Sequence, residues 1–302
     1  MYEVRWENFE YYYSVCRHFE LQAAGYKHFF MLFSIFAEIF KMTWVEVTAL
    51  ILSGLLVGFI NTLAGGGTII SLSLLMFMGL PANVANGTNR IAVVAQNLVA
   101  VRSFKQQKLL DVHKGFALAI PTVIGSVLGA FIAVDLNEMI IEKSIAVVMI
   151  FMLLFILYKP QKWLKGHREL MAKPVSTWMM ILFFFIGIYG GFIHVGVGYF
   201  LLAGTVLGAG FDLIRANAVK NLIVLAYAPF TLIIFMWQGQ VNYNYGLVHS
   251  IGNILGAYLA TKFAVNWGTN FVRWVIIIVI FVTTVQIFGL IDFRSVFTIL
   301  NK

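Results

Sequence analysis

The stretch NTLAGGGTIISLSLLMFMGLPANVANGTNR, residues 61–90, decides how this chain folds. A glycine cluster opens a short apolar run, Gly79-Leu80-Pro81 ends it, and a polar segment starts the next apolar run. As a helix, the run 68–80 reaches only about 20 Å, whereas the hydrocarbon core of a bilayer is about 30 Å thick. The stretch therefore predicts a discontinuous or re-entrant helix within a membrane.

The composition places the whole chain among polytopic α-helical membrane proteins. Of its 302 residues 61% are apolar and 11% are charged, where a soluble domain carries about 25% charged residues. This argues against a soluble enzyme, a disordered protein and a secreted disulfide scaffold, and the single Cys16 excludes a Cys-rich zinc module. The opening residues do not show the pattern of a cleavable signal peptide. The net charge of +8 comes from bases between apolar runs, which indicates the positive-inside rule rather than nucleic-acid binding.

Apolar runs of spanning length alternate with two short ones. The short runs, 68–80 and 199–209, each follow a glycine cluster and each end at a glycine-containing break. The long runs, each near the 20 residues that a spanning helix needs, are 46–63, 84–104, 115–134, 140–158, 176–194, 213–237, 246–265 and 271–291.

The two halves of the chain are similar to each other. A shift of 131 residues aligns 65–134 with 196–265 without a gap, and about a fifth of the aligned positions are identical, including five glycines, an Asn and a Gln. Internal duplication is typical of secondary transporters. We therefore predict an all-α polytopic membrane protein with two homologous repeats, each of about four long transmembrane helices plus one short half-helix. Residues alone do not distinguish parallel from inverted repeats.

The expected organisation has five parts. Bases in the loop 102–114 and in the linker predict that both are cytoplasmic, and acids near 135–142 predict an outside loop. The parts are an interfacial or amphipathic segment 1–43, a first transmembrane repeat 44–158, a basic cytoplasmic linker 159–174, a second transmembrane repeat 175–291 and a C-terminal tail 292–302.

The glycine clusters and the polar segments after the short runs are the candidate binding site. A glycine cluster before a helix lets a ligand approach unpaired backbone N–H groups at the positive end of the helix dipole, which favours an anion. Ionisable groups within a membrane usually face a cavity. The predicted substrate-binding residues are Gly65, Gly66, Gly67, Thr68, Asn86, Thr88, Asn89, Arg90, His194, Gly196, Gly198, Tyr199, Asn217, Lys220 and Asn221.

Other features have plainer interpretations. Paired small residues such as Gly54/Gly58 and Gly125/Gly129 predict close helix packing. We find no catalytic motif and no Cys/His ligand set, so no catalytic residue, metal or cofactor is predicted. Acidic groups near the glycine clusters are scarce, which favours an anionic over a cationic substrate.

Particular motifs carry a family resemblance over about residues 44–290. Asn61-Thr62-Leu63-Ala64-Gly65-Gly66-Gly67, then Gly79-Leu80-Pro81 and Ala85-Asn86-Gly87-Thr88-Asn89, resemble the TauE/SafE sulfite exporter family, also called the toluene-sulfonate uptake permease family. The run from Gly190 to Gly198 is similar to its repeated glycine motif. The resemblance implies a transporter for sulfite, sulfonates, thiosulfate or related anions.

These observations together predict a multi-pass secondary transporter of the plasma (inner) membrane. It would carry a small anion, most simply a sulfur-containing oxyanion or organosulfonate, by alternating access around a site between two glycine-led half-helices. Its partners would be this anion and the lipid bilayer, with no nucleic acid, and a homo-oligomer is left open. The alternatives are a passive anion channel and, less favoured, a membrane-embedded subunit of an enzyme complex.

Overall fold

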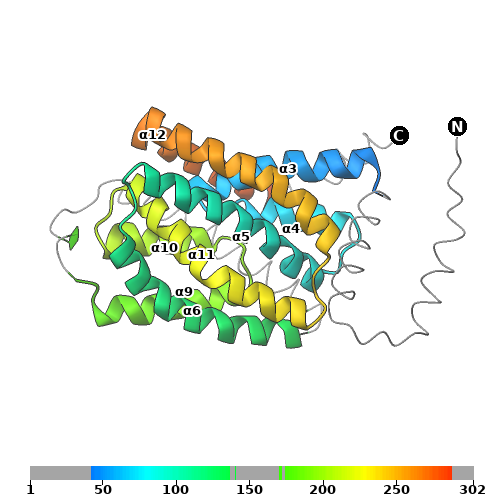
Figure 1. Ribbon diagram of the computed structural model, residues 1–302, viewed down its shortest axis with the longest axis horizontal. Helices are drawn as coiled ribbons and strands as arrows, with labels where there is room; N and C mark the ends of the chain where they lie inside the picture. Colours follow the sequence, from blue (N-terminus) through cyan, green and yellow to red (C-terminus); the bar gives the residue numbers. More distant parts are fainter. Residues whose placement is uncertain (1–41, 137–139, 141–169, 172–173, 288–302) are drawn as a thin grey trace, which may run out of the picture. The chain divides into compact units, whose positions relative to one another are not determined.

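A computed structural model describes residues 42–136, 140, 170–171 and 174–287 (Figure 1). Its described elements are all helices, as the composition predicts. The expected segment 1–43, span 140–158, linker 159–174 and tail 292–302 lie outside the described residues, apart from a few positions at their edges.

The first half of the chain contributes four described helices and the second half contributes four more plus one π-helical turn. The short apolar runs do form separate short helices, joined to their neighbours by non-helical breaks. In the first half these are α3 (Trp44–Leu63), α4 (Thr68–Phe77), α5 (Ala82–Gln106) and α6 (Val112–Asp135); in the second they are α9 (Thr177–Phe192), α10 (Val197–Ala203), the π-helix η2 (Gly204–Gly208), α11 (Leu213–Trp237) and α12 (Tyr243–Ile287).

The C-terminal part of the described chain differs from the sequence prediction. The runs 246–265 and 271–291 are expected as two spans, but residues 243–287 form one uninterrupted helix, α12. The residues 266–270 between the two runs, Asn-Trp-Gly-Thr-Asn, suggest a loop, yet no proline interrupts the segment. Each backbone N–H can therefore continue the helical hydrogen-bond pattern through these residues.

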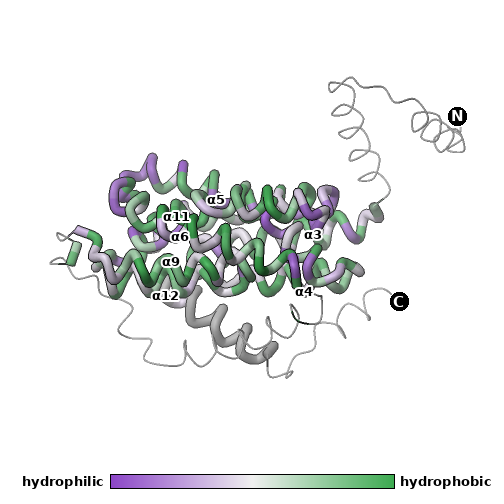
Figure 2. The backbone as a smooth tube through the Cα atoms, turned by 90° about the horizontal axis from the view of Figure 1, so that it is seen from below, coloured by the Kyte–Doolittle hydropathy of each residue, from purple (hydrophilic) through white to green (hydrophobic). Residues whose placement is uncertain are grey.

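Three described helices are long and apolar enough to cross a membrane: α3, α6 and α11. The helices α4, α9 and the continuous pair α10–η2 are apolar but shorter. Figure 2 shows apolar residues along most of the length of the helices. Large apolar side chains remain exposed at helical spacing on α6, which fits a surface in contact with lipid (Phe116, Ile120, Ile124, Leu128 and Phe131).

Glycines bring the helix backbones into direct contact, as the paired small residues predict. A Cβ on Gly54 or Gly58 would lie within 2.4 Å of α12 backbone oxygens. On Gly125 or Gly129 it would lie within 2.1 Å of backbone oxygens of α9. These contacts confirm close packing of α3 on α12 and of α6 on α9, which lie side by side in Figure 1. Another pair at the same spacing, Gly204 and Gly208, instead faces the side chains of Phe183 and Met179.

The two longest central helices, α5 and α11, run antiparallel. Arg90 near the start of α5 bonds to Thr231 near the end of α11. Phe104 at the end of α5 packs in one cluster with Ala218 near the start of α11. The loops that follow these helices, 107–111 and 238–242, therefore lie at opposite ends of the helical unit.

The backbone repeats its unusual positions at the spacing found in the sequence. α5 and α11 begin and end 131 residues apart, and so do the starts of α6 and α12. Among the described residues, every position with positive φ has its counterpart 131 residues away: Gly65 with Gly196, Gly79 with Gly210, and Lys108 with Gly239.

Candidate functional site

The two helix breaks touch each other through their backbones. Gly65, between α3 and α4, has φ of +93°, which favours glycine. A Cβ on Gly65 would lie 2.4 Å from the Cα of Gly198, and one on Gly198 would lie 2.4 Å from the Cα of Gly65. Gly196, with φ of +69°, is the N-cap of α10. The contact thus brings predicted glycines of both halves together.

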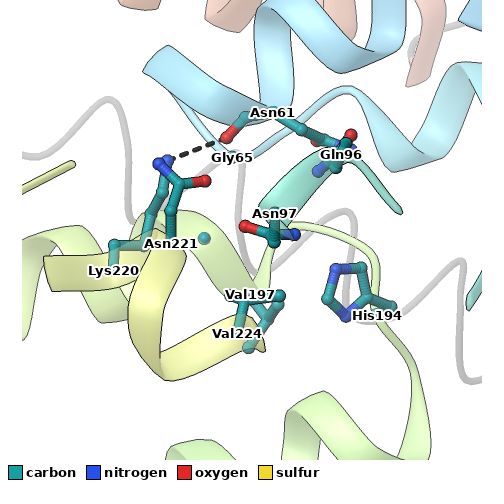
Figure 3. Close-up of a pocket in the computed structure, with 10 residues that line it drawn as sticks. Asn61, Gly65, Gln96, Asn97, His194, Val197, Lys220, Asn221 and Val224 are labelled. Carbon is teal, nitrogen blue, oxygen red and sulfur yellow. Dashed lines mark hydrogen bonds between the residues drawn. The ribbon is translucent and has the colours of Figure 1, made fainter. Parts of the chain in front are cut away.

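A narrow cavity lies at this contact, with room for about one water-sized molecule. Figure 3 shows polar side chains around it from α3, α5 and α11, together with His194 from the α9–α10 break. Five predicted site residues line it, because both breaks and the middle of α11 converge there. The lining consists of Asn61, Gly65, Gln96, Asn97, His194, Val197, Gly198, Lys220, Asn221 and Val224.

Lys220 is the cation of this cavity and is almost completely buried. Its Nζ donates to the backbone oxygens of Asn61 at 2.8 Å and Thr62 at 3.0 Å. Both residues lie in the last turn of α3. A third bond, of 2.8 Å, reaches Oδ1 of Asn217. All three ammonium hydrogens therefore have acceptors, and Lys220 fastens α11 to the C-terminal end of α3.

Arg90 fastens α5 to the C-terminal end of α9, but it does not line the cavity. It is fully buried on α5. Its guanidinium donates to the backbone oxygens of Gly191 at 2.6 Å and Gly190 at 3.4 Å, and to Oγ1 of Thr231 at 2.8 Å. The group also lies 4.5 Å from the ring centroid of Phe235. Arg90 therefore joins three helices. Three of its five N–H groups have acceptors, and its Nε is buried without a partner.

Neither buried cation is neutralised by a carboxylate. Within the described part of the chain, Arg90 and Lys220 make no ion pair with Asp or Glu. The partial negative charge at a helix C-terminus offsets some of the charge, since each cation binds carbonyls there. The remaining positive charge at Lys220 faces the cavity and favours an anion in it.

The predicted asparagines mostly hold helix ends. Asn86 donates to the Phe192 oxygen at 3.0 Å, and Asn221 donates to the Thr62 oxygen at 3.2 Å. Both therefore assist the cations at the C-terminal ends of α9 and α3. Asn89 is buried with neither side-chain polar atom partnered. Of these three asparagines, Asn221 lines the cavity and Asn86 and Asn89 do not.

Four predicted residues lie next to the cavity lining without being part of it. A Cβ on Gly66 would lie 2.1 Å from the Tyr199 hydroxyl, and this hydroxyl is buried without a partner. Gly67 is the N-cap of α4, and Thr68 accepts a 3.2 Å bond from Asn61. Thr88, further away, accepts a 2.8 Å bond from the Asn242 backbone at the start of α12.

His194 lies in the α9–α10 break and is held by tyrosines. Its Nδ1 lies 3.0 Å from the Tyr227 hydroxyl of α11. The Tyr189 hydroxyl donates to the backbone oxygen of Val195, the next residue. Tyrosines from α9 and α11 thus fix the break, and His194 faces the cavity between them.

Sequence reasoning did not choose Asn61, Gln96 and Asn97 as site residues, although all three line the cavity. In the sequence analysis, Asn61 appears only as part of the motif that resembles the family. Gln96 and Asn97 stand as two adjacent carboxamides in the middle of the apolar run 84–104. Polar groups at membrane depth usually face a cavity, so this pair was the available signal.

Comparison with known families identifies the chain. The sequence profile described as sulfite exporter TauE/SafE matches residues 50–287. The chain belongs to the TauE/SafE family. The match covers every described helix except the start of α3, so both breaks and the cavity fall within it.

Relatives of known name support the same assignment. A probable membrane transporter protein of Haemophilus influenzae is 25% identical over 233 residues, which cover 77% of this chain and 91% of the relative. One of Escherichia coli K12, YfcA, is 26% identical over 246 residues, 81% of this chain and 90% of the relative. A third, ORF9 of Sinorhizobium sp, is 24% identical over 230 residues, 76% and 87% of the two chains. No solved structure matches the chain.

Proposed function

We propose that this TauE/SafE protein is a secondary transporter of a small anion at the plasma (inner) membrane. The substrate class is a sulfur-containing oxyanion or organosulfonate, and the cavity at the contact of Gly65 with Gly198 is its binding site. The observation that carries the proposal is Lys220, a buried cation without a carboxylate partner in the described chain that faces this cavity. An entering anion would compensate its charge.

The transport mechanism is alternating access between inverted repeats. Two features support the duplication: helix bounds and positive-φ positions recur at 131 residues. The antiparallel direction of α5 and α11 supports inversion of the second copy. Inverted repeats with broken helices at mid-membrane are a common transporter plan, in which one repeat moves against the other around the site. The narrow cavity fits a closed state of a carrier better than an open channel.

The test is a binding and uptake screen with the purified full-length protein. Calorimetry in detergent and uptake into proteoliposomes would compare sulfite, thiosulfate, sulfonates, sulfate and carboxylates. We expect saturable uptake of a subset of the sulfur anions. Single-channel currents would instead indicate a channel, and the absence of binding and uptake for all of these anions would overturn the proposal.

A further inference from the structure

Two carboxamide oxygens face each other across the cavity. Figure 3 shows Asn97 of α5 and Asn221 of α11 with their Oδ1 atoms directed toward one another. Both side chains are about 99% buried. Within the described residues, Oδ1 of Asn97 is buried without a hydrogen-bond partner. The hydrogen bonds of the Asn221 side chain are all made by its Nδ2, not by its Oδ1. Two acceptors in this arrangement repel unless a donor lies between them.

The orientation of both amides is fixed by carbonyl groups. Nδ2 of Asn97 donates 2.7 Å to the Val93 oxygen. Nδ2 of Asn221 donates 2.7 Å to the Asn217 oxygen and 3.2 Å to the Thr62 oxygen. A carbonyl oxygen only accepts, so rotating either amide would place oxygen against oxygen. The cavity therefore presents Oδ1 atoms rather than N–H groups from these two residues.

Other groups of the cavity extend the same pattern. Oδ1 of Asn61 and Oε1 of Gln96 are also buried without a partner. The ammonium of Lys220 has already given all its hydrogens to protein oxygens. The cavity thus offers positive charge together with an excess of unused acceptors.

We propose that the cavity selects monoanions that carry a hydrogen-bond donor, an N–H or O–H group, which binds between Asn97 and Asn221. This inference rests on the proposed function and narrows its substrate class. A fully deprotonated dianion would point acceptor oxygens at Oδ1 of both residues and leave them unpaired. A protonated oxyanion, or an anion with an amino or hydroxyl group, satisfies both the charge of Lys220 and the amide oxygens.

The test compares sulfamate with methanesulfonate. Both are monoanions of similar size with three sulfur-bound oxygens, and an amino group in one replaces a methyl group in the other. Calorimetry on the purified full-length protein, in a buffer free of Na⁺, should give about tenfold or more tighter binding of sulfamate. A site built to hydrogen-bond a ligand group discriminates against the analogue that lacks it.

A matched pair of variants locates the preference. Asn97→Leu keeps the approximate shape but removes the acceptor, and should make the two affinities equal. Asn253→Leu is the control, because Asn253 is equally buried, donates an equivalent 3.0 Å bond to the His249 oxygen and lies outside the cavity. It should keep the preference for sulfamate.

The outcomes separate this inference from the proposed function. Equal affinities in the unsubstituted protein would overturn the donor preference and leave an anion transporter. Binding of both anions that requires added Na⁺, without a preference, would also overturn it and assign the oxygens to a cation. If neither these two anions nor any of the screened anions binds to folded protein, the proposed function itself fails.

Discussion

The two helix breaks are built alike but use different cations. At the first, the carbonyls that end α3 bind Lys220 of α11; at the second, the carbonyls that end α9 bind Arg90 of α5. Each half therefore holds the broken helix of the other half. In the alignment Arg90 matches Asn221 and Lys220 matches Asn89, so cation and amide have exchanged places. The exchange leaves only Lys220 at the cavity and makes the site asymmetric.

The short helices also differ in how they are fastened. Ser71 of α4 lies 2.8 Å from Nε2 of His249 on α12, whose Nδ1 lies 3.0 Å from the Leu50 oxygen of α3. Since a carbonyl only accepts, Nδ1 carries the proton and Nε2 accepts from Ser71. The position equivalent to Ser71 is Leu202 of α10, which packs in the main apolar cluster. At this pair of equivalent positions, the first short helix therefore makes a polar contact and the second makes an apolar one.

The largest expected contrast concerns orientation of the two halves. Gln107 and Gln238 occupy equivalent positions, one residue after α5 and after α11. In a background without Cys16, a cysteine at position 238 should react with an impermeant thiol reagent added outside intact cells, and one at position 107 should not. The bases of residues 102–114 predict a cytoplasmic location for the loop 107–111, and the loops after α5 and α11 lie at opposite ends of the helical unit. Equal labelling at both positions would contradict inverted repeats.

Loss of transport is expected from a single methyl group at the contact of the breaks. Gly198→Ala places a Cβ 2.4 Å from the Gly65 Cα, and backbone cannot move aside without separating the two breaks. We expect uptake into proteoliposomes to fall to background. Gly208→Ala is the control, since its Cβ meets only the flexible Met179 side chain at 3.0 Å. Normal uptake by both variants would remove the contact from the mechanism.

Neutralising the two cations should separate binding from stability. Lys220→Gln removes the charge at the cavity, and we expect anion affinity to fall about tenfold or more, which corresponds to about 1.4 kcal/mol. Arg90→Gln removes a charge outside the cavity lining and should change affinity less. Gln has two N–H donors, whereas Lys220 and Arg90 each make three hydrogen bonds, so each variant leaves at least one buried acceptor without its donor. Both should therefore lower the thermal unfolding midpoint in detergent. Affinity is measured by calorimetry on folded, monodisperse protein.

Other outcomes for the anion affinities of these two variants would place the substrate elsewhere. If Arg90→Gln weakens anion binding more than Lys220→Gln does, the substrate lies nearer the α9–α10 break than the cavity indicates. If neither changes affinity, the backbone amides at the breaks are the remaining candidates for anion ligands.

Much of the fold could be predicted from the sequence because membrane helices are set by local apolar length. The bounds of α11 agree with the prediction at both ends, and the short helices follow directly from their glycine clusters. The continuity of α12 could not be predicted in the same way. The residues 266–270 resemble a loop, but they contain no proline, so the helix can continue through them.

The candidate site was less accessible to sequence reasoning because it depends on which helix faces meet. Glycine clusters and cations mark the region in which the cavity lies, and Gly65, Gly198 and Lys220 all line that cavity. Local sequence does not reveal that the guanidinium of Arg90 donates to carbonyls at the end of α9, because the contacting residues lie 100 positions apart. Gln96 and Asn97 belong to no motif, and they line the cavity because of how α5 packs against the breaks.

The smallest expected effect tests the polar fastening of α4. Ser71→Ala removes the hydroxyl that His249 binds and leaves Nε2 without a donor inside the protein. Hydrogen bonds between membrane helices contribute about 1 kcal/mol or less, so we expect the unfolding midpoint in detergent to fall by a few degrees at most. Ser73→Ala, two residues along the same helix but exposed, is the control and should unfold as the unsubstituted protein does. Leu202, at the equivalent position of α10, packs in the main apolar cluster. A larger fall of the midpoint in Ser71→Ala would mean that the two short helices differ more in how they are stabilised than their equivalent positions in the chain suggest. An equal, negligible effect at both serines would show that apolar packing suffices for both short helices and that the contact with His249 adds nothing measurable to the stability of the first.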